Sequence, residues 1–170
     1  METKNIPTAI ILHHEGNSNG FDIVNEYHHQ KWNFKSSLGF YIGYQIYISL
    51  DGTIHRGRTD QEDGAHTLGG WNQKSIGICL QGNTDISTPT EEQTTALEKL
   101  IKEKMALYAI SNNQLYCHGD LWPTTCPGKN LRNWLVNYKG GDFANLQRQI
   151  IILKNLIAEL QRSLAKLIGK

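Results

Sequence analysis

Ala9-Ile10-Ile11-Leu12-His13-His14 is the stretch around which we expect the fold to form. Four apolar residues in succession are typical of a short buried β-strand, and this run ends abruptly in two histidines. A side chain at the end of a core strand is carried by a rigid part of the structure. His13 is therefore well placed to act as a ligand.

Further stretches also have the composition of strands. The aromatic and β-branched run 44–50 is followed by Asp51-Gly52 and by a second short run at 53–56, and this pattern predicts a hairpin. Residues 75–80, Ser-Ile-Gly-Ile-Cys-Leu, predict another buried strand. Residues 114–117 predict a strand that leads directly into a histidine.

Three segments favour helix. Residues 21–32 have an amphipathic pattern. Thr88-Pro89-Thr90-Glu91 has the features of a helix start, with the first threonine as N-cap and the proline at the first helical position, and this helix should run to about Ile110. Residues 130–138 predict a last short helix, after which Gly140-Gly141 predicts a hinge.

The tail, residues 140–170, differs in kind from the body, residues 1–139. Its apolar residues are spaced alternately four and three apart, which is a heptad seam with Ile or Leu at a and Leu at d. We expect homo-oligomers to form through residues 146–167; a helix folded back on its own domain and a helix lying on a membrane surface are the alternatives. The seam consists of Leu146, Ile150, Leu153, Ile157, Leu160, Leu164 and Leu167.

Charge is unevenly distributed along the chain. The total of +1 creates no global field for nucleic acid, and we expect no such partner. From Phe143 onward five basic residues stand against Glu159, a net charge of +4, which leaves residues 1–142 at −3. The basic tail should favour an anionic wall or membrane surface.

Cysteine usage and the first residues bear on the compartment. Three cysteines without regular spacing do not make a disulfide framework. Residues 1–5 contain no apolar stretch of signal-peptide type, and no run reaches transmembrane length. We expect synthesis in the cytoplasm without a signal peptide, so that export depends on outside help.

A turn-rich loop, residues 116–128, adds His118 and Cys126 to His13. Two imidazoles and a thiol are ligands that zinc prefers. Structural zinc sites use four protein ligands, whereas catalytic sites use three and leave one position to water. The three residues therefore predict a catalytic Zn²⁺ site. Cys79, inside a strand-like run, is interpreted as a small core residue.

Further motifs occur in order along the chain: Ile11-Leu12-His13-His14, Gly43-Tyr44, Asp51-Gly52-Thr53, Gly57-Arg58, Gly64-Ala65-His66 with Gly70 and Asn72, Ser75-Ile76-Gly77-Ile78, Thr88-Pro89-Thr90, and His118 with Thr124-Thr125-Cys126-Pro127-Gly128. Over about residues 7–136 the chain thus resembles the superfamily of type-2 N-acetylmuramoyl-L-alanine amidases and peptidoglycan recognition proteins, which includes phage lysozymes of the T7 type. The resemblance implies an α/β fold, with a central mixed sheet of about five strands, helices on both faces and an additional C-terminal helix.

The resemblance also implies roles for individual residues. The three ligands named above would hold the zinc, and His14 is a weaker candidate. Tyr44 falls on the family's catalytic tyrosine. Thr124 stands where phage members of the T7 type have a lysine and many recognition proteins have a threonine, and it is expected to help stabilise an oxyanion. The substrate groove should lie beside the metal, lined by His66, Asn72, Trp71, Arg58 and Trp122.

The function implied is zinc-dependent hydrolysis of the amide bond between N-acetylmuramic acid and L-alanine in bacterial peptidoglycan. We expect a phage endolysin that acts on the cell wall after holin-type release. A cytoplasmic amidase that recycles soluble muropeptides and a peptidoglycan-binding module without catalysis are the alternatives. Family members that lack the cysteine bind without cleaving, so Cys126 favours an enzyme.

Overall fold

The structure, a computed structural model, describes residues 5–168 apart from the side chains of 142–146 and 165–167. Its contacts divide the chain into two compact units, Met1–Arg132 and Asn133–Lys170. The division of the chain into a body at 1–139 and a tail at 140–170 stays a prediction.

The first unit is built on one mixed sheet. Strands β1, β4, β5 and β2 run parallel, and β3 pairs antiparallel with β2 across the expected hairpin. The α/β class and the five-stranded mixed sheet are confirmed. In the sheet order β3-β2-β4-β1-β5, the strands span Ile54–Arg56, Ile46–Ile48, Ser75–Leu80, Ala9–His14 and Leu115–Cys117.

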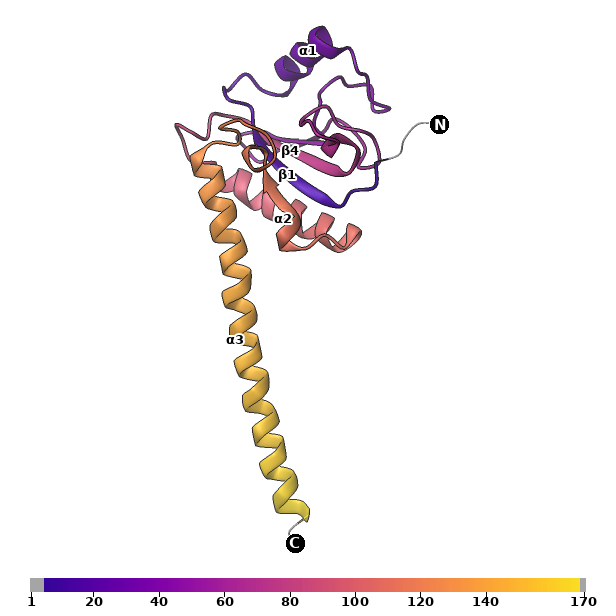
Figure 1. The fold of residues 1–170 in the computed structure, drawn as a ribbon. Coiled ribbons are helices and arrows are strands. Elements are labelled where there is room, and N and C mark those ends of the chain that lie inside the picture. Colours follow the sequence, from indigo (N-terminus) through magenta and orange to yellow (C-terminus); the bar gives the residue numbers. More distant parts are fainter. Residues whose placement is uncertain (1–4, 169–170) are drawn as a thin grey trace. The chain divides into compact units, whose positions relative to one another are not determined.

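Helices cover both faces of this sheet. Helix α1 and helix α2 lie on opposite sides of β1 and β4 (Figure 1). On the α1 side, Phe21 and Val24 of the helix pack with Ile42, Tyr47 and Cys79 in one buried cluster. The helices are α1 (Phe21–Trp32), α2 (Glu91–Tyr108) and α3 (Lys129–Ile168), with single 3-10 turns η1 (Trp71–Gln73), η2 (Asn112–Gln114) and η3 (His118–Asp120).

The register of the parallel strands decides which side chains share a face. His13 of β1 and Tyr47 of β2 are both aligned with Cys79 of β4, and aligned residues of neighbouring strands point to the same side of a sheet. Cys79 and Tyr47 face α1, so His13 points to the α1 side as well. On the other edge of β1, Leu12 is aligned with Cys117, so that His13 and the following His118 come next to each other.

The start of α2 differs from the predicted one. Thr90, rather than Thr88, is the N-cap: its hydroxyl accepts from the backbone N–H of Gln93 at 3.1 Å, while the Gln93 side chain accepts from the Thr90 N–H at 3.2 Å. The side-chain amide of Gln93 also donates to the backbone O of Ile48 in β2. This capping box satisfies two N–H groups at once, which explains why the later threonine is selected.

Helix α3 continues through Gly140 and Gly141, where the sequence predicted a hinge. That prediction is wrong for a physical reason. A glycine in a helix costs about 1 kcal/mol relative to alanine but keeps its backbone N–H, so it weakens a helix without ending it. No helix of the described residues is both long and apolar enough to cross a membrane.

A buried ion pair fixes α2 to the loop that follows β3. The ammonium of Lys104, 3% exposed, lies 2.7 Å from Oδ2 of Asp60, which also accepts from the Tyr108 hydroxyl at 2.9 Å. The side chain of Asn5 donates to the backbone O of Asp60 at 2.9 Å. The pair therefore joins three segments that are far apart in sequence.

We expect Lys104→Ala to lower the free energy of unfolding by about 3–5 kcal/mol, because it leaves a buried carboxylate without its cation. The measurement is urea unfolding followed by circular dichroism. Lys102→Ala is the matched control on the same helix, since its pair with Glu98 is exposed and its loss should change stability by less than about 0.5 kcal/mol. Equal losses in the two variants would show that the Lys104 pair is not structural.

Candidate metal centre

Three side chains from separate segments converge at the end of β1. The ligand atoms of His13, His118 and Cys126 all lie within 4.8 Å of one another. Nδ1 of His13 is 3.7 Å from the Cys126 sulfur, and the His13 and His118 ring centroids are 4.5 Å apart. The structure thus brings together the three residues that the sequence proposed as ligands.

The loop that carries Cys126 is held against the residue after His118. The Gly119 N–H donates to the backbone O of Cys126 at 2.7 Å. A Cβ at Gly119 would lie 2.5 Å from the backbone O of Thr124, so only glycine permits this close approach. At the next residue, the Thr84 hydroxyl donates to the backbone O of Pro127. The backbone carbonyls of Cys126 and Pro127 are therefore both held by hydrogen bonds.

His14 is held away from the centre. Its Nδ1 accepts from the Thr84 backbone N–H at 3.1 Å. Alternation along β1 turns it to the opposite face from His13. Among the two adjacent histidines the geometry favours His13 as the ligand.

Burial keeps the three candidate ligands uncharged in the absence of a metal. It lowers the pKa of His13 well below the usual value, with smaller contributions from His66 and His118, and it also lowers the pKa of His118. Burial raises the pKa of the Cys126 thiol to about 12. The imidazoles are thus in the neutral form that a metal requires, whereas the thiol must lose its proton on binding.

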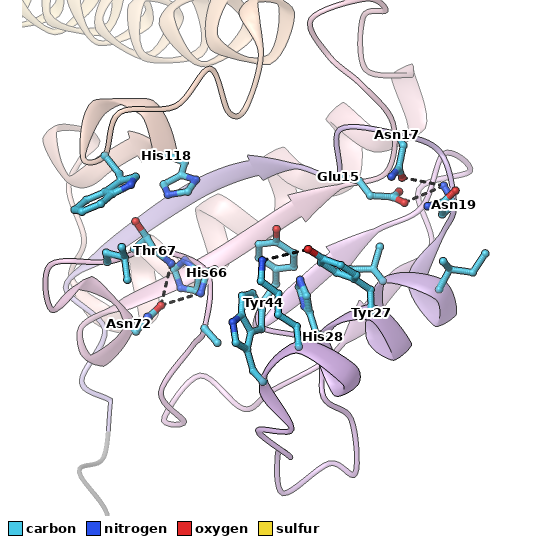
Figure 2. Close-up of a pocket in the computed structure, with 17 residues that line it drawn as sticks. Glu15, Asn17, Asn19, Tyr27, His28, Tyr44, His66, Thr67, Asn72 and His118 are labelled. Atoms are coloured by element: carbon cyan, nitrogen blue, oxygen red, sulfur yellow. Dashed lines mark hydrogen bonds between the residues drawn. The ribbon is translucent and has the colours of Figure 1, made fainter.

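A groove of about 800 Å³ opens beside the centre. His118, Tyr44 and His66 contribute to one part of its wall, and α1 forms much of the remainder (Figure 2). The Tyr44 ring centroid lies 5.1 Å from that of His13. Burial raises the pKa of Tyr44 well above 10, so its hydroxyl keeps a proton to donate at neutral pH.

The remaining predicted site residues divide into two groups. His66, Asn72 and Trp122 line the groove. Thr124 is exposed on the Cys126 loop, and its hydroxyl oxygen accepts from the Cys126 N–H at 3.2 Å, which leaves its own proton free to be donated. Trp71 and Arg58 form the second group, which lies outside the lining of the groove.

The residues that line the groove do not include Arg58 or Trp71. Arg58 is 1% exposed, and its guanidinium donates to the backbone carbonyls of Ile42, Phe34 and Asp63. The Trp71 ring lies 5.4 Å from that of Tyr116 and beneath the Lys74 ammonium. An arginine that satisfies carbonyls cannot be distinguished from an exposed one by composition alone.

Ile23 and Tyr27 of α1 are groove residues that the sequence did not single out. The pattern of 21–32 predicted only an amphipathic helix, and these two side chains are 55% and 56% exposed and line the groove. Lys31 and Trp32, one turn later, also line it. The recurrence of large side chains at i and i+4 (Ile23, Tyr27, Lys31) was the available signal.

These features define a class: an α/β domain with a His-His-Cys centre at the wall of an open groove. Over residues 3–129 the chain matches Amidase_2, described as N-acetylmuramoyl-L-alanine amidase. The chain belongs to this family.

Individual relatives agree with this assignment. The chain is 39% identical over 99 residues to peptidoglycan-recognition protein SC2 of Drosophila simulans, covering 57% of this chain and 53% of that protein. It is 33% identical over 98 residues to the endolysin of Escherichia phage T7, covering 55% and 63%. The matches thus span between half and two thirds of the length of these relatives. The amidase LysC from Clostridium intestinale has a similar fold, with a TM-score of 0.66 and 35% identity over 74% of this chain and 79% of that one.

The buried side chain of His28 should make the stability of the fold depend on pH. It is 5% exposed, and its Nδ1 accepts from the Gly43 N–H at 2.9 Å. Burial, with smaller contributions from Lys31 and Arg58, lowers its pKa to about 4. The pKa of His28 in the folded protein is below its unfolded value near 6.5. The contribution of neutral His28 to the free energy of unfolding is therefore fully present above pH 6.5 and is lost as the pH falls toward 4.

His28→Asn should flatten this dependence, since the amide oxygen can accept from Gly43 but does not titrate. We expect the parent protein to lose about 2 kcal/mol more than the variant between pH 7 and pH 4.5. Urea unfolding at several pH values measures the difference. Parallel pH profiles for the two proteins would assign the acid sensitivity to other groups.

Proposed function

We propose that this chain hydrolyses the amide bond between N-acetylmuramic acid and L-alanine in bacterial peptidoglycan, with zinc held by His13, His118 and Cys126. The observation that carries the proposal is the convergence of three ligand atoms within 4.8 Å at the end of β1, where His118 also lines the groove. Membership of the amidase family supports the choice of bond.

The residues fit a zinc ion by chemistry and by distance. With Zn–N near 2.0 Å and Zn–S near 2.3 Å, tetrahedral ligand atoms lie roughly 3.3–3.6 Å apart. The 3.7 Å between His13 Nδ1 and the Cys126 sulfur needs almost no adjustment. Three protein ligands leave one coordination position, as a catalytic centre requires.

When bound, zinc acts as a Lewis acid that polarises the scissile carbonyl and provides a water-derived nucleophile near neutral pH. The protein's own groups do the remaining work. The groove walls orient the glycan and stem peptide. The Tyr44 hydroxyl, which stays protonated, and the Thr124 hydroxyl are proposed to donate to the oxyanion that develops on the carbonyl. Tyr44 and Glu15, which both line the groove, are the candidates for proton delivery to the leaving amine.

We propose an endolysin as the biological role, made in the host cytoplasm and acting on the wall after holin-type release. Similarity to a phage endolysin at 33% identity supports this role. A recycling amidase is the alternative within enzymes, and a binding module without catalysis is the alternative outside them. An endolysin should clear intact sacculi, whereas a recycling enzyme should act only on small soluble muropeptides.

The deciding experiment is digestion of purified sacculi by the zinc-loaded full chain, with new L-alanine N-termini as the readout. We expect their release, and we expect Cys126→Ser to abolish both zinc binding and release, because a serine hydroxyl does not replace the thiolate ligand. Tyr44→Phe is the comparison variant: it should keep the zinc and lose about 10²–10³-fold in activity.

If the zinc-loaded protein releases no L-alanine N-termini from either sacculi or muropeptides, the proposal that it is an enzyme is refuted. Activity retained by Cys126→Ser would show that the centre is misplaced. Release from soluble muropeptides alone would replace the endolysin by the recycling role.

The tail supports a second proposal, self-association through a coiled coil. The large apolar residues at 151–164 of α3, all of them isoleucine or leucine, are each at least half exposed. Ile150 and Ile157 at a with Leu153 and Leu160 at d favour a two-stranded parallel coil. The seam ends Leu146 and Leu167 lie outside the described side chains. The basic residues of the tail leave an anionic wall or membrane surface as the competing partner.

Light scattering tests the coil. The full chain should have about twice the monomer mass of 19.2 kDa, and a version that ends at Gly141 should be monomeric. Ile157→Glu places a charge in the seam and should produce monomers, whereas Asn155→Glu, on the outer face of the same helical turn, should not. A monomeric full chain would refute the coil, and vesicle binding by that monomer would identify the competing partner.

A further inference from the structure

His13 has a different partner on each ring nitrogen. Its Nδ1 faces the Cys126 sulfur at 3.7 Å, and its Nε2 lies 3.0 Å from Nδ1 of His66. The two histidine rings meet edge to face, with centroids 5.0 Å apart and an interplanar angle of 79°. One side of the His13 ring is therefore available to a metal and the other is committed to His66.

The hydrogen bond between two neutral imidazoles can carry its proton in one of two ways. If His13 binds zinc through Nδ1, that nitrogen must offer a lone pair, so the His13 proton is on Nε2. Nε2–H then donates to His66 Nδ1, and His66 keeps its own proton on Nε2. In the reverse arrangement His66 donates, and the His13 proton occupies the nitrogen that the metal needs.

The His66 ring is fixed in a slot formed by glycine. A Cβ added at Gly64 or Gly77 would come within 2.4 Å or 2.6 Å of a carbon of this ring. Neither glycine has a positive φ, so close approach of the ring, rather than backbone conformation, accounts for them. Gly77 belongs to β4 and lies two residues before Cys79, so the two share a face of the sheet. Cys79 is aligned with His13 of β1, which places Gly77 on the same face as His13.

The backbone at His66 is fixed as well. Oδ1 of Asn72 accepts from the N–H groups of His66 and Thr67 at 2.9 Å and 3.1 Å. The Gly64 N–H donates to the Asn72 backbone O at 2.9 Å. Asn72, predicted only as a groove residue, thus holds the loop that presents His66 to His13.

One observation indicates that packing alone does not explain His66. Its Nε2 is buried and has no hydrogen-bond partner among the described residues. A buried polar atom without a partner is unfavourable, so an apolar side chain would fill the slot at less cost. The nitrogen that does have a partner is the one that contacts His13.

We propose that His66 is a positioning residue whose Nδ1 accepts the His13 Nε2 proton and so holds His13 in the tautomer and orientation that present Nδ1 to the metal. Outer partners of this kind commonly change metal affinity by about 10–100-fold. The proposal rests on the zinc site of the proposed function. It does not depend on the bond that the chain cleaves.

An isosteric pair of variants separates hydrogen bonding from packing. Asparagine and leucine have the same shape, but only the amide oxygen of His66→Asn can accept near the position of Nδ1. We expect His66→Leu to weaken zinc binding by about 10–100-fold and His66→Asn to remain within a few-fold of the parent. Competition with a chromophoric chelator measures the affinity, and the visible spectrum of the Co²⁺-loaded full chain reports whether the centre keeps its tetrahedral geometry.

A second measurement needs no variant. Long-range ¹H–¹⁵N correlation spectra of the zinc-loaded parent should show His66 protonated on Nε2 and His13 on Nε2. His66 protonated on Nδ1 would overturn the proposal, and so would equal zinc affinities of the Asn and Leu variants. If the parent binds zinc and obeys these expectations but releases nothing from sacculi or from soluble muropeptides, the proposed amidase function fails while the role of His66 stands.

Discussion

The parallel pairing of β1 with strands on both sides is the constraint on which the rest of the structure depends. Because β4 and β5 run in the same direction as β1, the carboxyl ends of all three strands meet at one edge of the sheet. Loops that follow parallel strands gather at that edge, where open α/β sheets place their ligands. A slip of one residue between β1 and β5 would align His118 with a residue on the opposite face of the sheet. The candidate centre is therefore a consequence of register.

Amide side chains connect the sheet to its loops through hydrogen bonds to backbone groups. Gln45, fully buried, accepts from the Gly77 N–H at 2.8 Å and donates to the backbone O of Glu62 at 3.0 Å. The buried Asn5 amide donates to the backbone O of Asp60, and Oδ1 of the half-buried Asn72 accepts from the His66 N–H. An amide can donate and accept at once, so each one satisfies backbone groups that no strand pairs. The long connection between β3 and β4, in which the short 3-10 turn η1 is the regular element, is ordered in this way.

The parts that the sequence predicted are those with strong local signals. The run at 9–12 is apolar on both faces because a central parallel strand is buried on both. The candidate ligands after it were proposed from donor chemistry together with the family resemblance, and their role stays a prediction. The surroundings of a side chain are what local patterns do not report. That the Arg58 guanidinium meets backbone carbonyls and that Tyr27 lines the groove depends on distant segments of the chain. The choice between Thr88 and Thr90 depended on a reciprocal bond from Gln93.

The identity of the partner on His13 bears on the charge of the centre. In many zinc sites a carboxylate accepts the outer proton of a ligating histidine, and its negative charge makes the imidazole a stronger donor to the metal. Here the partner is a neutral imidazole in a slot of glycine backbone, so it orients the ring without adding charge. The Cys126 thiolate would then be the one anionic ligand among the three, and a bound divalent cation would retain net positive charge. A more positive centre is a stronger Lewis acid, which is what hydrolysis of an unactivated amide requires. The glycine slot and the neutral histidine would thus combine precise orientation of His13 with an electron-poor metal at the proposed centre.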